Sequence, residues 1–154
     1  AVSQAVDQVF STDGPRKADL TVQVEEGLTA WCDQSALVQV LVNLLQNARR
    51  YTPEGTPIRV EGAVDGARIR LAVVDEGPGI PPQEQERIFE RFYRVDKGRS
   101  RQVGGTGLGL SIVRHLLAAM HGEIRVRDNT PHGCIFELWI PVDPESSELS
   151  RRKG

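Results

Sequence analysis

The sequence has little sulfur and few aromatic residues. Its 154 residues include two cysteines and one methionine, and the aromatic fraction is 5%. Cys32 and Cys134 lie far apart and fit no Cys-x-x-Cys or Cys/His spacing. This argues against a disulfide framework or a zinc site and indicates reduced cytosolic thiols. A single domain of this length needs no such support, because folding buries roughly 68–70% of the surface of the unfolded chain.

Long apolar runs and an excess of one charge are also missing. The longest apolar runs, residues 71–74 and 116–120, are far shorter than the ~20 residues of a membrane-spanning helix, so we expect no membrane contact from this chain. The net charge of -2 disfavours direct nucleic-acid binding. The chain opens Ala1-Val2-Ser3, without an initiator Met or a signal-peptide pattern. We therefore expect it to be part of a longer protein.

Glycine, by contrast, is concentrated in one stretch. Seven of the 15 glycines fall within residues 77–109, where an even spread would place roughly three. The seven are Gly77, Gly79, Gly98, Gly104, Gly105, Gly107 and Gly109. Glycine is useful where the backbone turns sharply or approaches a ligand closely. The cluster indicates either a long floppy loop or a region that cradles a ligand.

The hydrophobic pattern predicts an alternation of helices and hairpins. Helices are expected over residues 1–10, 33–51, 82–87 and 106–119, and strands over 20–24, 58–64, 68–74, 123–127 and 134–142. Residues 29–32 could form a further short strand. Consecutive hairpins favour an α+β fold, a two-layer α/β sandwich whose mixed, mostly antiparallel sheet is covered by helices on one face. We expect residues 1–142 to form the domain and residues 143–154 to be a disordered tail.

Apolar spacing also predicts which helix faces are buried. Asp33 is the expected N-cap of the helix over residues 33–51, since its carboxylate can accept from free N–H groups of the first turn. The buried stripe of this helix is Leu37, Leu41, Leu44 and Ala48. For the helix over residues 106–119 the predicted stripe is Leu108, Ile112, Leu116 and Ala119, with Gly122 as the C′ glycine.

Polar residues on the helix over residues 33–51 form the first candidate site. Asn43 and Asn47 are one i,i+4 step apart, and Arg50 lies a turn further on. Two amide oxygens aimed at one point would suit Mg²⁺, which prefers oxygen ligands and keeps waters and phosphate oxygens. The alternative for these two residues alone is an ordinary solvated helix face.

Two glycine-containing segments form the other candidates. In residues 75–80, Asp75 ends a strand, where it is a natural acceptor for the exocyclic amine of a base, although a plain Asp-Gly turn is the alternative. Residues 104–110 run directly into a helix, so their N–H groups and the helix N-terminus suit phosphate oxygens. The spacing matches neither Gly-x-Gly-x-x-Gly nor the P-loop pattern.

Four segments occur in the order found in a known family. Residues 43–53 lie on a predicted helix, residues 75–80 and 89–94 in loops, and residues 105–110 at a helix start. Together they resemble the N, G1, F and G2 boxes of sensor histidine kinases. The resemblance covers residues 1–142 and implies the family's catalytic ATP-binding domain, with a Bergerat-type nucleotide fold and with ATP and Mg²⁺ as cofactors. The glycine-rich region would then be a nucleotide site.

The resemblance implies roles for residues near the metal and the base. Asn47, with Asn43, would bind the Mg²⁺ that bridges the ATP phosphates. Arg50, where the family often has Lys, would contact phosphate and complete the catalytic set, and Tyr51 would pack near the nucleotide. The residues around the adenine would be Asp75, which accepts its amino group, Gly77, Gly79 and Ile80.

The resemblance also implies a mobile lid over the phosphates, residues 93–104. Phe89 and Phe92 would anchor its base, and Arg91 or Arg94 would reach the γ-phosphate. The phosphate turn would consist of Gly105, Thr106, Gly107, Leu108 and Gly109. The lid segment is net positive and contains Gly98 and Ser100, so bound polyphosphate would attract and order it. A solvated surface loop is the alternative.

The reaction type depends on Asn43. Relatives with the same nucleotide fold that hydrolyse ATP, such as heat-shock chaperones, gyrases and mismatch-repair proteins, have a Glu general base at this place. A neutral amide cannot take a proton from water, so hydrolysis should be slow. None of His115, His121 and His132 matches the family's phosphoacceptor motif, so that histidine is expected on a separate dimerisation domain.

The resemblance therefore implies a protein histidine kinase that is incomplete without its phosphoacceptor domain. Its further partner would be a response regulator, which receives the phosphoryl group on an aspartate. The domain would be the cytoplasmic part of a membrane-anchored sensor. Two alternatives stay open: a protein serine kinase of the anti-sigma type, and a nucleotide-sensing interaction module that transfers nothing.

Overall fold

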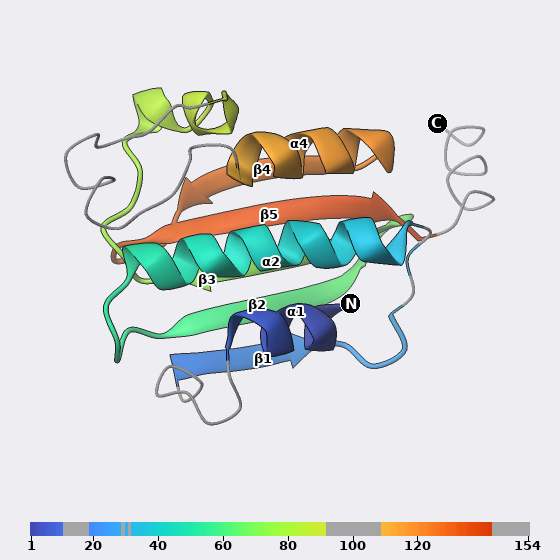
Figure 1. The fold of residues 1–154 in the computed structure, drawn as a ribbon, viewed down its shortest axis with the longest axis horizontal. Helices are drawn as coiled ribbons and strands as arrows, with labels where there is room; N and C mark the ends of the chain where they lie inside the picture. Colours follow the sequence, from blue (N-terminus) through green and yellow to red (C-terminus); the bar gives the residue numbers. More distant parts are fainter. Residues whose placement is uncertain (11–18, 29, 31, 92–108, 143–154) are drawn as a thin grey trace.

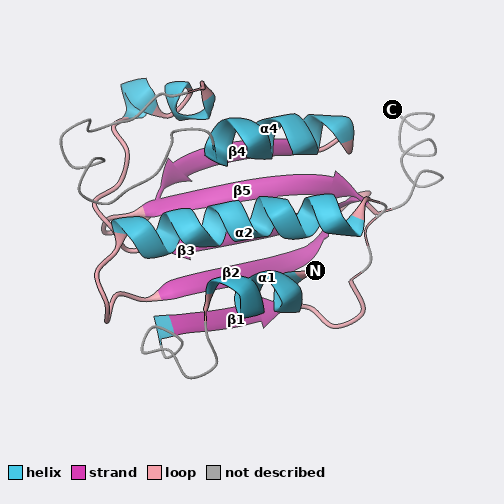
Figure 2. Cartoon of the chain, viewed as in Figure 1, coloured by secondary structure: helices cyan, strands magenta, loops and turns pink. Residues whose placement is uncertain are grey.

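Five strands form a single mixed sheet. The computed structural model describes residues 1–10, 19–28, 30, 32–91 and 109–142. The strands are β1 (Leu20–Val24), β2 (Ile58–Asp65), β3 (Arg68–Asp75), β4 (Glu123–Asp128) and β5 (Cys134–Pro141). Their order across the sheet is β1-β2-β3-β5-β4, as Figure 2 shows. β1 pairs with β2 in parallel and the other three pairings are antiparallel, which confirms the predicted sheet.

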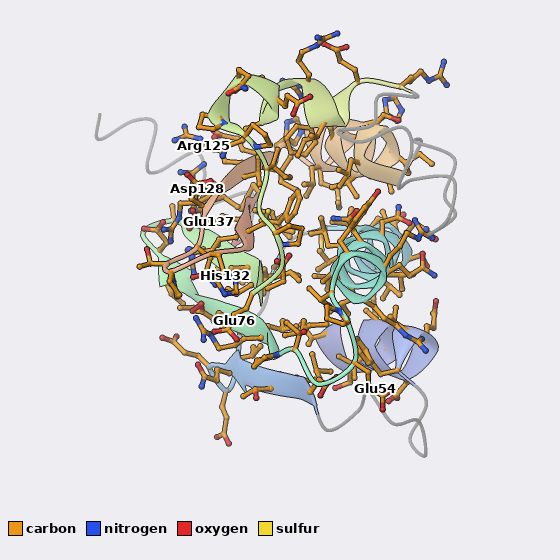
Figure 3. The ribbon with its side chains drawn as sticks, turned by 90° about the vertical axis from the view of Figure 1, so that its left-hand side faces the viewer. Glu54, Glu76, Arg125, Asp128, His132 and Glu137 are labelled. Carbon is orange, nitrogen blue, oxygen red and sulfur yellow. The ribbon has the colours of Figure 1, made fainter. Side chains whose placement is uncertain are left out.

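Helices cover one face of this sheet. They are α1 (Val2–Val9), α2 (Gln34–Tyr51) and α4 (Gly109–Ala119). Figures 1 and 3 show the resulting two layers, with α2 lying along the middle of the sheet. The buried core lies between the layers and includes Leu41, Leu44, Val60, Val73 and Leu138. Within the described residues, no helix is long and apolar enough to cross a lipid bilayer.

α2 forms as its sequence predicts. The carboxylate of Asp33 accepts a hydrogen bond from the N–H of Ala36 at 3.1 Å and caps the first turn. The predicted stripe of Leu37, Leu41, Leu44 and Ala48 is fully buried. The helix ends at Tyr51 because Thr52 is extended before Pro53, as expected for a residue that precedes proline.

Two predicted elements are wrong. Residues 82–87 are not one helix but two separate 3₁₀ turns, η2 (Pro82–Glu84) and η3 (Arg87–Phe89). The second turn directs Ile88 and Phe89 into the core, and this tertiary packing overrides the local preference for one continuous helix. The suggested strand over residues 29–32 is also not found, because the described residues of this range, Ala30 and Cys32, belong to no strand.

The buried face of α4 differs from the predicted stripe. Val113 and Leu117 are buried, whereas Ile112 is 41% exposed and Ala119 is exposed. Leu116 is half-buried, and Leu108 lies outside the described residues. The helix has apolar residues on two adjacent stripes, and its contacts with α2, β4 and η3 decide which one faces inward.

The end of α4 also differs in detail. The residue in the left-handed region is His121, with φ 59°, and not Gly122. Gly122 instead donates its N–H to the carbonyl of Leu117 at 2.7 Å. A Cβ at Gly122 would lie 2.7 Å from the carbonyl oxygen of Trp139, so close backbone packing explains the glycine.

On the sheet face opposite these helices, a buried carboxylate pairs with two arginines. Glu137 is 8% exposed and binds Arg70 Nε at 2.6 Å and Arg127 Nε at 2.5 Å. Burial opposes ionisation of this carboxyl, but the hydrogen bonds from Arg127 and Arg70 outweigh burial and lower its pKa. The ionised form therefore stabilises the fold above the ordinary carboxyl pKa of about 4.3, and this stabilisation is lost as the pH falls through the lowered pKa.

We expect Glu137→Gln to lower the free energy of unfolding at pH 7 by about 1–2 kcal/mol, because a neutral amide replaces a carboxylate shared by two arginines. The difference from the wild type should shrink as the pH falls toward 3. Urea unfolding at pH 7, 4 and 3 measures both effects. Glu61→Gln is the control, since Glu61 meets Arg59 at 3.4 Å in an exposed pair worth about 0–1 kcal/mol. Equal effects of the two variants would contradict the prediction.

Candidate functional site

One end of the sheet brings together segments that are distant in the sequence. The end of β3, the end of α2, the start of α4 and the turn between β4 and β5 all lie at the left in Figure 1. Figure 3 views the molecule from this end. Asn43 Nδ2 donates to the carbonyl of Gly109 at 3.5 Å, so α2 and the start of α4 meet directly. The predicted candidates on α2, after β3 and on α4 therefore share one region.

Asp75 is the buried acid of this region. Only 6% of it is exposed, and its Oδ1 accepts hydrogen bonds from Gly77 N at 2.9 Å and Cys134 N at 3.2 Å. Burial raises the pKa of this carboxyl, and the two backbone hydrogen bonds act in the opposite direction. Both of these donors bind Oδ1, and no donor to Oδ2 is found among the described residues. Every fully buried side-chain oxygen in this part of the chain has a partner, so the unpaired Oδ2 is not fully buried. Oδ2 is therefore accessible to a ligand.

The turn after Asp75 is held close to α2. A Cβ at Gly77 would lie 3.1 Å from Thr52 Cγ2 and 3.3 Å from the carbonyl oxygen of Tyr51. Gly79 has φ 80°, a conformation that side chains of other residues disfavour. Ile80 is half-buried and packs on the main core. Gly79 is thus favoured by its backbone conformation and Gly77 by the close packing around it, which favours a shaped turn over a floppy loop in this part of the cluster.

The two asparagines of α2 differ in their surroundings. Asn43 is half-buried, accepts from Gln39 Nε2 at 3.3 Å and donates to Gly109 O. Asn47 is also half-buried and lies one turn further along the same helix. Among the described residues no partner is found for the side chain of Asn47. Its amide oxygen is therefore available to a ligand.

This donor set fits a magnesium ion held mainly by phosphate and water oxygens. No group of three His, Cys, Asp or Glu residues able to hold a metal occurs in the described part of the chain. Mg²⁺ is commonly bound by one or two protein oxygens together with substrate phosphates and waters. The Asn47 amide suits such a site, and the Asn43 oxygen, which accepts one hydrogen bond from Gln39, keeps a second lone pair for the ion.

The other predicted residues are placed as follows. Arg50 and Tyr51 are exposed at the end of α2, and Arg91 is exposed after η3. Phe89 is buried and meets Phe136 edge to face, with ring centroids 6.5 Å apart, so it is a core residue. Gly109 is the first residue of α4. Outside the described residues lie Phe92, Arg94, Gly105, Thr106, Gly107, Leu108 and lid residues 93–104, together with the tail, residues 143–154.

Residues of the β4–β5 turn were missed by sequence reasoning. Asn129, His132, Gly133 and Cys134 all contact the segment that contains Asp75. In the sequence, residues 129–133 have the composition of an ordinary hairpin turn. Nothing local connects this turn to a segment more than 50 residues earlier, so only the pairing of β3 with β5 brings the two together.

Comparison with known proteins agrees with this arrangement. Residues 32–144 match the model of a family described as histidine kinase-, DNA gyrase B-, and HSP90-like ATPase. The sensor-like histidine kinase SenX3 of Mycolicibacterium smegmatis is 42% identical over 152 residues, which cover 97% of this chain and 40% of that protein. The chain therefore spans less than half the length of this curated relative.

Solved structures support the same assignment. The catalytic domain of histidine kinase ThkA is 30% identical, with 94% of this chain and 92% of that chain covered and a TM-score of 0.77. Full-length ShkA in complex with AMPPNP is 30% identical, with 91% of this chain and 29% of that chain covered and a TM-score of 0.72. The chain thus belongs to the histidine kinase-, DNA gyrase B- and HSP90-like ATPase family, as the ATP-binding catalytic domain of a sensor histidine kinase.

Proposed function

We propose that this domain binds Mg²⁺-ATP and presents the γ-phosphate to a histidine on a separate dimerisation domain of the same protein. The observation that carries the proposal is the convergence of two features at one end of the sheet. One is the buried carboxylate of Asp75, with a free Oδ2. The other is the Asn43–Gly109 contact, which joins α2 to the N-terminus of α4.

Asp75 recognises the base in this proposal. Its Oδ1 is occupied by two backbone N–H groups, which leaves Oδ2 to accept from the amino group of adenine. Guanine presents a carbonyl oxygen at the corresponding position, which would oppose the carboxylate. A buried polar group that is left unpaired discriminates strongly against the wrong ligand. The turn with Gly77, Gly79 and Ile80 would line the adenine pocket.

The phosphates would lie between α2 and the start of α4. The N–H groups and partial positive charge of the first turn of α4, from Gly109, suit phosphate oxygens. Asn47, with Asn43, would hold the Mg²⁺, which neutralises part of the phosphate charge, and Arg50 would contact phosphate. By resemblance to the G2 box, Gly105, Thr106, Gly107 and Leu108 complete the turn. Residues 93–104, with Phe89 and Phe92 at their base, would act as the lid, and Arg91 or Arg94 would reach the γ-phosphate.

Asn43 decides what the bound ATP does. Its amide cannot remove a proton from water, and its N–H is directed at the carbonyl of Gly109. The γ-phosphate therefore awaits a stronger nucleophile. A histidine nitrogen of the partner domain forms the new bond to the γ-phosphorus, the bond to the β–γ bridging oxygen breaks, and ADP leaves with the electron pair. Positioning and charge neutralisation are the contributions of this domain.

The proposal extends to the whole protein. The SenX3 relative is longer than this chain, which leaves room for a dimerisation domain and a sensing part. We propose a membrane-anchored sensor with this domain in the cytoplasm. The phosphohistidine would pass its phosphoryl group to an aspartate of a response regulator.

We expect Asn47→Ala to slow phosphotransfer by about 100-fold, because one of the groups that hold charge at the transferring phosphate is lost. The 154-residue chain is mixed with a separately produced histidine-bearing dimerisation domain and γ-labelled ATP, and acid-labile label on that domain is followed in time. Gln46→Ala is the control, since Gln46 is the exposed neighbouring amide on α2.

Three outcomes would contradict the proposal. Full activity of Asn47→Ala would remove the metal role of this residue. Acid-stable label would indicate a serine kinase. A wild-type chain that does not bind Mg²⁺-ATP at millimolar nucleotide would overturn the proposal as a whole.

A further inference from the structure

The turn between β4 and β5 is bound to the segment that contains Asp75. Asn129 Nδ2 donates to the carbonyl of Asp75 at 2.9 Å, and His132 Nδ1 lies 3.1 Å from the carbonyl oxygen of Gly77. A Cβ at Gly133 would overlap the carbonyl oxygen of Asp75 and lie 2.8 Å from the Cα of Glu76. The two backbones are therefore packed in direct contact. Figure 3 shows His132 and Glu76 at this end of the molecule.

The hydrogen-bond pattern assigns the orientation of both side chains. Asn129 Oδ1 accepts from the N–H of Thr130 at 2.9 Å, which directs Nδ2 toward the carbonyl of Asp75. A carbonyl oxygen only accepts, so His132 must carry its proton on Nδ1 to bond with Gly77. Both residues thus act as donors to the backbone on either side of Glu76.

Neither side chain is needed to close the hairpin. The turn is already closed by the Asn129 N–H, which donates to the carbonyl of Gly133 at 3.0 Å. β4 and β5 pair continuously from Asp128 with Cys134 to Glu123 with Trp139. Asn129 Oδ1 accepts from Thr130 within the turn, whereas the donors Asn129 Nδ2 and His132 Nδ1 are directed at the other loop. Their contacts therefore affect the conformation of residues 75–77 more than the stability of the hairpin.

We propose that Asn129 and His132 are positioning residues for base recognition. They fix the backbone on both sides of Glu76, while Cys134 N fixes Oδ1 of Asp75, so that Oδ2 points at the amino group of the base. This inference rests on the proposed function, in which Asp75 accepts from adenine. Loss of either donor frees the turn to rotate. The domain then no longer binds a base with the amino group more tightly than a base without it.

The test compares ATP with purine ribonucleoside triphosphate, which has the same phosphates but lacks the 6-amino group. The ratio of their Kd values measures the contact between the amino group and Asp75. For Asn129→Ala, Asn129→Asp and His132→Ala we expect the Kd for ATP to rise about 10-fold, equivalent to ~1.4 kcal/mol. The Kd for the analogue should stay within about 3-fold, so the ratio falls toward one.

Two further variants separate positioning from a general structural role. His132→Asn keeps an N–H donor at the δ position and should retain the wild-type ratio. Thr130→Ala removes an exposed side chain of the same turn and serves as the control. Equal weakening of ATP and the analogue in the Asn129 and His132 variants, or an unchanged ratio in all of them, would overturn the inference.

The test also distinguishes this inference from the proposed function. If the wild-type chain already binds both nucleotides equally, the assignment of Asp75 to the base fails, and the inference fails with it. If the wild type prefers ATP and Asp75→Asn removes that preference while the turn variants keep it, only the positioning role fails. The Tm of each variant without nucleotide shows whether it is folded. Because His132 is exposed, His132→Ala is the variant expected to affect stability least.

Discussion

Asp75→Asn is expected to raise the Kd for ATP by about 100-fold, or ~2.7 kcal/mol, while leaving the domain folded. The asparagine keeps an oxygen for the N–H groups of Gly77 and Cys134, which bind Oδ1 in the wild type. Its NH₂ group then occupies the position of Oδ2. It presents a donor to the amino group of adenine, which is also a donor. The affinity for ATP therefore falls for two reasons: two donors face each other, and the negative charge of the carboxylate is missing.

The same substitution should not lower stability at pH 7. Burial raises the pKa of Asp75 above its value in the unfolded chain, so the charged form is disfavoured in the folded state. The stability that this group contributes is present below the unfolded pKa and is lost as the pH rises through the folded pKa. At pH 7 the neutral amide avoids this penalty. We expect the Tm of Asp75→Asn to equal or exceed that of the wild type.

Isothermal titration with Mg²⁺-ATP and thermal unfolding without nucleotide measure the two effects. Asp7→Asn is the matched control, since it removes one exposed carboxylate on α1, away from the site. A tightly binding Asp75→Asn variant would contradict base recognition by Asp75. A large fall in its Tm would instead make Asp75 a mainly structural acid.

Gly133→Ala is expected to destabilise the domain by about 2–5 kcal/mol. Gly133 has φ 111°, which side chains disfavour, and a Cβ there would lie 2.8 Å from the carbonyl carbon of Asp75. The new methyl group must push the β4–β5 turn away from residues 75–76. For a domain of this size the Tm should fall by roughly 5–15 °C.

Gly66→Ala is the control for this prediction. Gly66 also has a positive φ, 63°, but an added Cβ would meet nothing within 4 Å. Its cost should be limited to backbone strain, roughly 1–2 kcal/mol. Thermal and urea unfolding of both variants separate strain from crowding. Similar losses for the two variants would show that the close packing of Gly133 on Asp75 is not important for stability.

Local patterns predicted the elements that are stabilised locally. The i,i+3 and i,i+4 stripe of α2, its Asp33 cap and the hairpin of the strands over residues 58–64 and 68–74 were all predicted, because each depends on neighbours close in the sequence. The position of Asp75 at the end of a strand followed from the same patterns. The predictions for residues 82–87 and for the buried face of α4 were wrong. In both places the structure depends on packing against residues that are distant in the sequence.

The sequence by itself determined the order along the chain of the long helices and of the strands in the sheet, the mixed sheet and the resemblance that assigns ATP binding. It also determined which segments contain candidate residues, because residue type and spacing set the local backbone. Only the tertiary structure decided which of these meet: Asn43 with Gly109, and Asp75 with Asn129, Gly133 and Cys134. These contacts join residues more than 50 positions apart through the pairing of β3 with β5 and the packing of α2 on α4. No local propensity encodes such a contact, because its energy exists only once the sheet and helices have assembled.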